Sequence, residues 1–147
     1  MKVSPEQLPD QLAKRLDAAY LVTGDEPLLV QEACDRIRER ALADGHEERT
    51  LFQTDAQFDW QQVHDETQAL SLFANQRRIE VRMHSGKPGK GRDILEAFAK
   101  APPEDVVLIV SGPRLDGSET SKAWYRHWQK VGIHVPVWPV DPADFPR

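Results

Sequence analysis

Five short apolar runs, partly β-branched, alternate along the chain with four segments whose apolar residues recur at helical spacing. This alternation is typical of a parallel sheet in which helices connect successive strands. The clearest run is 106–110, because five consecutive apolar residues predict a central strand covered on both faces. The other predicted strands are 19–23, 49–54, 78–83 and 133–140. The sequence therefore predicts an α/β fold with a five-stranded, mainly parallel sheet flanked by helices.

Two of these strands have polar residues that predict their surroundings. The polar flanks of 49–54 favour a position near the edge of the sheet. In 78–83 the apolar side chains alternate with Arg78, Glu80 and Arg82, which predicts that one face of this strand is half exposed to water.

The helical segments have recognisable ends. Ser4 and Gln7 have the spacing of a capping box, and Pro9 is expected to kink or restart the helix that follows. A single later helix is expected to begin at Ser118 and to end at Gly132.

The composition fits one globular domain. Of the 147 residues, 39% are hydrophobic and 29% are charged, and the formal charge is -5. This charge gives no overall attraction to nucleic-acid backbones or anionic lipid, so any contact with nucleic acid must be local. The single cysteine, Cys34, cannot form an internal disulfide and agrees with a reducing cytoplasm. Residues 1–12 lack the apolar stretch of a signal peptide, and no run approaches the length of a membrane span.

Two loops invite comparison with phosphate-binding loops. The turn 24–30 follows the first strand, where such a loop belongs, but it lacks a second glycine, a lysine and a following Ser or Thr. The loop 86–93 has the spacing of two glycines, yet it places Arg92 and Asp93 where Lys and Ser or Thr are needed. We therefore expect no nucleotide hydrolysis, while weak contact of Lys87, Lys90 and Arg92 with phosphate stays open.

Residues for catalysis or metal binding do not cluster in the sequence. The five histidines show no ligand spacing, and no Gly-x-Ser-x-Gly elbow occurs. The sequence predicts neither a catalytic site nor a cofactor nor a metal. Trp124 and Trp128 lie one helical turn apart, a spacing that suits stacking on bases but also lines a core helix.

The segment 69–78 joins a predicted helix to the third strand. At 100° per residue, Leu72 would point away from the core if the helix continued through Leu70. A separate turn would instead place Leu72 and Phe73 at the N-terminal edge of the sheet, rimmed by polar residues, as in a small interaction patch. The alternative is that both side chains pack under the sheet.

Two stretches resemble the delta-subunit family of the bacterial DNA polymerase III clamp loader. They are 19–32, which reads AYLVTGDEPLLVQE, and 69–74, which reads ALSLFA. The similarity extends to 107–112 and to Trp124. It implies a P-loop NTPase or AAA+-like fold without a functional P-loop, a domain over 1–140, and the start of a linker at 141–147 that leads to helical and collar domains.

The resemblance also implies a function. In this family the delta subunit is a non-hydrolysing member of a pentameric loader, which binds the ring-shaped sliding clamp and holds one interface open. An apolar cluster at the helix-to-strand tip enters a pocket of the clamp, and the matching positions are Leu70, Leu72 and Phe73. Leu70 stands where relatives commonly carry methionine, and periodicity places it in the core, so the family assignment is firmer for the other two.

The partners implied by the resemblance are the sliding clamp, other loader subunits through domains that this chain lacks, and DNA within the full assembly. Two alternatives of other classes are a nucleotide-binding enzyme fragment that uses the loop 86–92, and a single-strand DNA-binding module that uses Trp124 and Trp128.

Overall fold

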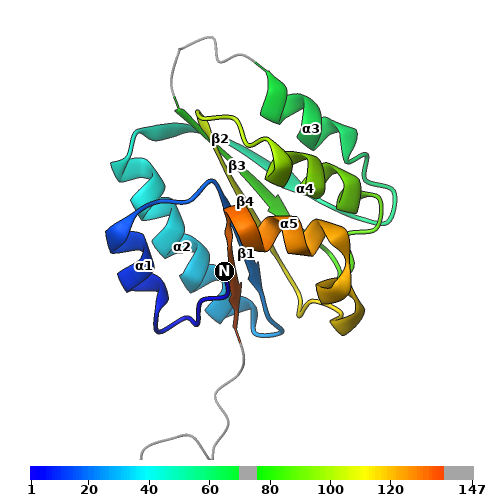
Figure 1. Ribbon diagram of the computed structural model, residues 1–147, viewed down its shortest axis with the longest axis horizontal. Helices are drawn as coiled ribbons and strands as arrows, with labels where there is room; N and C mark the ends of the chain where they lie inside the picture. Colours follow the sequence, from blue (N-terminus) through cyan, green and yellow to red (C-terminus); the bar gives the residue numbers. More distant parts are fainter. Residues whose placement is uncertain (70–75, 138–147) are drawn as a thin grey trace, which may run out of the picture.

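The computed structural model describes residues 1–69 and 76–137, which form a parallel sheet with helices on both faces (Figure 1). The strand order is β2-β3-β4-β1-β5, and every neighbouring pair is parallel. The strands are β1 (Ala19–Thr23), β2 (His46–Gln53), β3 (Gln76–Arg82), β4 (Val106–Gly112) and β5 (Ile133–Pro136). The predicted fold class, five strands and parallel sheet are confirmed.

The helices divide between the two faces of the sheet. One face is covered by α1 (Leu8–Lys14) and α2 (Pro27–Ala43). The other is covered by α3 (Gln61–Gln68), α4 (Gly91–Lys100) and α5 (Ala123–Val131), with the short 3-10 helix η1 (Gly117–Ser121) before α5. No helix within 1–69 and 76–137 is long and apolar enough to cross a bilayer.

The central strand β4 supplies side chains to two separate cores. Val107 and Ile109 pack with α1 and α2, whereas Leu108 and Val110 pack with the helices of the opposite face. Successive residues of a strand point to opposite faces, so an unbroken apolar run suits a strand that is covered twice. The prediction for 106–110 is confirmed.

The strand β2 lies at the edge of the sheet, as predicted, but it begins at His46 and not at Arg49. Residues 46–48 are polar and give no apolar pattern, yet His46 and Glu48 pair with β3, with an irregularity between them. Hydrogen bonds between backbones do not require apolar side chains, and for that reason the pattern missed the first three residues.

The prediction that one face of β3 is half exposed to water is wrong for Arg78 and Glu80, whereas Arg82 is half-buried. Arg78 and Glu80 are only 7% and 2% exposed. The Nε atoms of Arg38 and Arg49 donate to the Glu80 carboxylate at 2.7 and 2.8 Å, and the Nε of Arg78 lies 3.7 Å from it. These charges can be buried because they compensate one another.

Two helix starts test the capping predictions. Ser4 and Gln7 exchange backbone-to-side-chain hydrogen bonds of 3.1 and 3.2 Å. The helix begins at Leu8, so Pro9 lies in its first turn and does not kink or restart it. The single helix expected from Ser118 is instead η1 followed by α5. Lys122 between them has extended backbone angles, which breaks the helix.

The strand expected over 133–140 ends at Pro136, and 138–140 lie outside the described residues.

Candidate functional site

The predicted clamp-contact residues Leu70, Leu72 and Phe73 lie outside the residues that the structure describes. Their flanks are described: α3 ends at Gln68, and β3 begins at Gln76. In a parallel sheet the N-termini of the strands share one edge, so the chain enters β3 at that edge, opposite the turn that follows β1 (Figure 1).

Arg77 connects the two flanks of the segment 70–75. Its Nη1 donates to the carbonyl oxygen of Glu66 at 2.9 Å, and its Nη2 donates to the carbonyl oxygen of Ala69 at 2.7 Å. Glu66 is in the last turn of α3, and Ala69 is the residue that caps it. The Arg77 side chain is only 6% exposed. A guanidinium at the C-terminal carbonyls of a helix is favoured by their partial negative charge.

A cavity of about 400 Å³ lies at the other end of the strands, where β1 ends and the turn to α2 begins. It is lined by residues that include Asp25, Pro27, Cys34, Arg38 and Arg82. In this fold class, nucleotides bind where such a helix begins, because its free N–H groups face the ligand. Here the turn offers an acidic side chain and a proline without an N–H, and Arg38 is already paired with Glu80. The expected loss of a working P-loop agrees with this chemistry.

Cys34 has no chemistry to offer in that cavity. Its side chain is buried on the apolar face of α2, and burial raises the pKa of its thiol to about 11. The thiol is therefore protonated at neutral pH and is a poor nucleophile.

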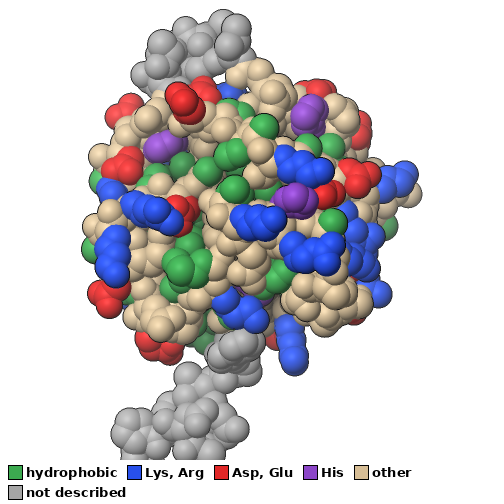
Figure 2. Space-filling view, in the orientation of Figure 1, with side chains coloured by type: hydrophobic (Ala, Val, Ile, Leu, Met, Phe, Trp, Pro, Cys, Tyr) green, Lys and Arg blue, Asp and Glu red, His purple; other side chains and the backbone are tan. Residues whose placement is uncertain are grey.

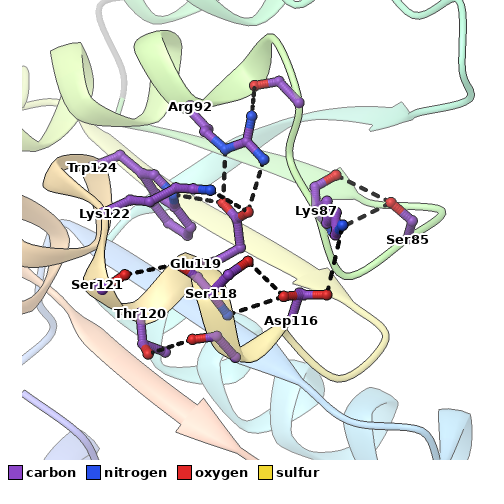
Figure 3. Close-up of polar contacts among 12 residues, drawn as sticks. Ser85, Lys87, Arg92, Asp116, Ser118, Glu119, Thr120, Ser121, Lys122 and Trp124 are labelled. Carbon is purple, nitrogen blue, oxygen red and sulfur yellow. Dashed lines mark hydrogen bonds and ion pairs between the residues drawn. The ribbon is translucent and has the colours of Figure 1, made fainter.

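The loop 86–93 is held by ion pairs within the protein (Figure 3). The Nε and Nη2 of Arg92 each donate to the Glu119 carboxylate at 2.8 Å, and Lys87 lies 3.8 Å from Asp116. Glu119 is fully buried. Its pKa is lowered to about 2, first by the hydrogen bonds from Arg92 and also by those from Trp124 and Lys122. Arg92 is thus committed to a structural partner and not to a phosphate.

The two glycines that give this loop its P-loop spacing are explained by packing. A Cβ on Gly86 would lie 2.1 Å from the carbonyl oxygen of Arg114, and one on Gly91 would lie 2.4 Å from Cε2 of Trp60. Both positions need glycine because other parts of the protein approach closely. The spacing is therefore no sign of a nucleotide site.

Trp124 and Trp128 are both buried in the core between the sheet and α4 and α5. Trp124 Nε1 donates to Glu119 at 3.1 Å, and Trp128 Nε1 donates to the carbonyl oxygen of Ile133 at 3.4 Å. The core interpretation of their spacing is correct, and the two rings are unavailable for stacking on bases. Basic and acidic side chains also lie interspersed over the face shown in Figure 2.

The described residues bring together no group of three or more His, Cys, Asp or Glu side chains that could hold a metal ion. The most buried histidine, His134, has two hydroxyl partners: Thr23 Oγ1 lies 2.9 Å from Nε2, and the Tyr125 hydroxyl lies 2.7 Å from Nδ1. Burial lowers the pKa of His134 to about 4, so it is neutral at pH 7.

A comparison with models of protein families shows the family to which the chain belongs. The model described as DNA polymerase III, delta subunit, matches residues 20–134, which is most of the chain. The chain belongs to the DNA polymerase III delta-subunit family. The predicted resemblance to this family is confirmed.

Two curated relatives carry the same description. The DNA polymerase III subunit delta of Escherichia coli is 32% identical over 148 residues, which cover 100% of this chain and 43% of the relative. That of Haemophilus influenzae is 28% identical over 124 residues, which cover 84% of this chain and 36% of the relative. The delta-family chain thus spans less than half the length of these relatives.

Two solved structures share the fold. A DNA clamp loader delta protein of Bacillus subtilis superposes with a TM-score of 0.70 at 16% identity, covering 93% of this chain and 43% of the other. The ORC1 protein of Aeropyrum pernix, solved in complex with DNA, superposes with a TM-score of 0.51 at 13% identity, covering 93% of this chain and 44% of the other. These likenesses confirm the predicted fold class of the chain, a parallel sheet flanked by helices that both proteins share.

Proposed function

We propose that this chain binds a ring-shaped sliding clamp through Leu70, Leu72 and Phe73 and favours the open form of the ring for loading onto DNA. The observation that carries the proposal is family membership over residues 20–134, a range that includes the segment 70–75 between α3 and β3. The ion pair of Arg92 with the buried Glu119 and the acidic turn at Asp25 support a scaffold that performs no nucleotide chemistry.

The domain organisation belongs to the same proposal. Residues 1–140 form the clamp-binding domain, and 141–147 begin a linker toward helical and collar domains that contact the other loader subunits. DNA is met within the full assembly. This function takes place in the cytoplasm, where the single cysteine, Cys34, stays reduced.

The energetics require only ordinary apolar burial. Burying one leucine or phenylalanine side chain is worth about 1.5–3 kcal/mol, so two or three anchors can dominate a modest interface. Ring opening needs no catalysis, because a ligand shifts an equilibrium by the difference between its affinities for the two states. The loader domain must therefore bind the open clamp more tightly than the closed one.

Calorimetric titration with the cognate clamp tests the anchors. We expect the double variant Leu72→Ala with Phe73→Ala to bind at least about a hundredfold more weakly, or about 2.7 kcal/mol, with an unchanged fold. Leu28→Ala is the matched control, because Leu28 is a 67% exposed leucine at the start of α2. Unchanged affinity of the double variant, or its unfolding, would refute the proposal.

A second measurement tests ring opening. Two fluorophores placed across one interface of the clamp should report a larger separation when the chain binds, and the double variant should cause no change at the same concentration. Tight binding without a change in separation would remove the opening step and leave only clamp binding.

A further inference from the structure

We propose that the exposed face of α5 binds the phosphate backbone of DNA through a row of three cations, the α5 row: Lys122, Arg126 and Lys130. This inference rests on the proposed function in taking DNA as a partner. It goes further, because it assigns a DNA contact to this domain and names the residues that make it.

The α5 row lies along one side of the helix. Residues four apart are neighbours on a helix surface, and Lys122, Arg126 and Lys130 have that spacing. Arg126 and Lys130 are exposed, and the side chain of Lys122 is 37% exposed. At about 1.5 Å per residue the row is about 12 Å long, a length over which one strand of DNA carries about three or four phosphates. The row therefore suits a line of regularly spaced anions.

The helix that carries the α5 row does not neutralise it. Residues 123–131 include no Asp or Glu. Neither the Arg126 nor the Lys130 side chain forms an ion pair with a residue of 1–69 or 76–137. Like charges four residues apart repel each other, so a second cation beside Lys130 does not stabilise the free helix. A polyanion along the row would offset this repulsion.

Two carboxylates lie beside the α5 row, and both are already paired. Glu119 is fully buried and lies 3.3 Å from Lys122 (Figure 3). Glu96, on α4, lies 3.3 Å from His127 and 3.5 Å from Lys100. On the face shown in Figure 2, Lys and Arg side chains gather over α5 and beside it. The surface around the row is therefore locally basic, although the formal charge of the chain is -5.

The α5 row is carried by a helix that is fixed to the core. Trp124 and Trp128, on the other side of α5, are buried. Trp124 Nε1 donates to the Glu119 carboxylate at 3.1 Å, and Trp128 Nε1 donates to the carbonyl oxygen of Ile133 at 3.4 Å. Because the helix is held in place, binding costs little more than the freedom of the cationic side chains themselves.

The lack of apolar side chains on this face favours DNA over an acidic protein or an anionic membrane. The aromatic residues of α5 are buried. The large apolar side chains that are exposed among the described residues all lie outside α5: Met1, Leu28, Leu42 and Leu51. Protein interfaces depend on buried aromatic and apolar anchors, and helices on lipid surfaces insert such side chains. A phosphate backbone needs only cations, because binding releases its condensed counterions.

An NMR titration of the isotope-labelled chain tests the α5 row, with a duplex DNA of about 20 base pairs at about 0.1 M salt, where distant charges are screened. We expect saturable amide shifts centred on α5. The dissociation constant should rise with salt with a logarithmic slope of about 2 to 3, as three phosphate contacts require. The double variant Arg126→Gln with Lys130→Gln should bind at least about tenfold more weakly, and its slope should fall to about 1.

Lys14→Gln with Arg36→Gln is the matched control. Both residues are exposed cations, and they lie on α1 and α2, which cover the opposite face of the sheet. This control changes the net charge by the same amount and should bind DNA within about twofold of the unchanged protein. Equal losses of affinity in the two double variants would overturn the proposal. So would shifts centred away from α5, the absence of saturable binding, or the failure of the α5 variant to fold.

Poly-glutamate of the same total charge is the second probe. It should bind more weakly than the duplex, because a flexible chain of carboxylates carries its charges less densely than DNA does. Binding as tight as that of the duplex would overturn the assignment to DNA and would indicate an acidic protein as the partner.

Calorimetric titration with the clamp separates this inference from the proposed function. The α5 variant should bind the clamp as the unchanged protein does, because the α5 row is not among the proposed clamp contacts. If the chain binds the clamp but not DNA, only this inference fails. If the variant Leu72→Ala with Phe73→Ala binds the clamp normally, the proposed function fails and the DNA titration keeps its own result.

Discussion

Arg92 and Glu119 meet through two hydrogen bonds of 2.8 Å each, although 27 residues separate them in the chain. The pair joins the first turn of α4 to η1, and its carboxylate is fully buried (Figure 3). Lys122 adds a third contact at 3.3 Å. The ion pair therefore holds the basic loop after β3 against the rest of the protein.

Replacing Arg92 by leucine should lower the free energy of unfolding by about 3 kcal/mol, because Glu119 would remain buried with only Lys122 to compensate its charge. Urea denaturation measures this loss. The double variant Arg92→Leu with Glu119→Leu should lose less than Arg92→Leu alone, since it leaves no uncompensated carboxylate. A loss below about 1 kcal/mol in the single variant would contradict the structural role of the pair.

Acid should destabilise the protein in two steps. His134 has an ordinary pKa of 6.5 and a folded pKa of about 4, so protonation favours the unfolded chain. The stability that depends on neutral His134 is complete above pH 6.5 and is lost as the pH falls toward 4, by up to about 3 kcal/mol. The pKa of Glu119 falls from 4.5 to about 2, which adds a second loss between those values. Urea titrations from about pH 8 to about pH 2 measure both steps, and His134→Gln should remove the first.

Gly91→Ala should destabilise the protein by about 2 kcal/mol, because the new Cβ would lie 2.4 Å from the Trp60 ring. In an open helix the same change would stabilise by about 0.5–1 kcal/mol, so the sign of the effect reports the steric conflict. Thermal unfolding provides the measurement. Gly117→Ala serves as control, since a Cβ there meets nothing within 4 Å, and a stabilising Gly91→Ala would show that Trp60 moves aside freely.

Cys34 should resist alkylation in the folded protein. Its thiol is buried, and its pKa of about 11 leaves almost no thiolate at pH 8. Iodoacetamide should label the protein quickly in about 8 M urea, which unfolds most proteins, and hardly at all without urea, as measured by mass spectrometry. Rapid labelling of the native protein would mean that α2 opens readily.

ATP with Mg²⁺ should leave the melting temperature unchanged, because a ligand that binds the folded state raises it and neither glycine-containing loop offers a phosphate cradle. Differential scanning calorimetry over a range of ATP concentrations is the measurement. A saturable rise would revive the nucleotide-binding alternative and would direct attention to Arg82 in the cavity beside Asp25.

The fold could be predicted because its strongest signals are local. An apolar run such as 106–110 needs two covered faces, and the alternation of strands and helices allows few other architectures. Polar residues limited the prediction. Glu80 and Arg78 were expected to face water, because periodicity shows which side of the sheet a side chain faces and does not show whether an ion-pair partner lies there. The break at Lys122 depends on the backbone conformation of one residue.

The candidate site was predicted less completely. Leu70, Leu72 and Phe73 were proposed as clamp contacts through resemblance alone, because the pattern of an apolar connection also suits burial under the sheet. The contact of Arg77 with the end of α3 was not predicted, because two adjacent arginines at the start of a strand look alike in sequence. Only the three-dimensional structure shows that one of them binds the carbonyls of α3 and the other approaches Glu80.

The carboxylate of Glu80 also favours one alignment of β2 with β3. Arg49 reaches it from β2, and Arg38 reaches it from α2. If β2 slipped by one residue along β3, Arg49 would swing to the opposite side of the sheet and abandon the carboxylate. The ion pair therefore fixes the pairing register of β2, an edge strand with few apolar residues, relative to β3.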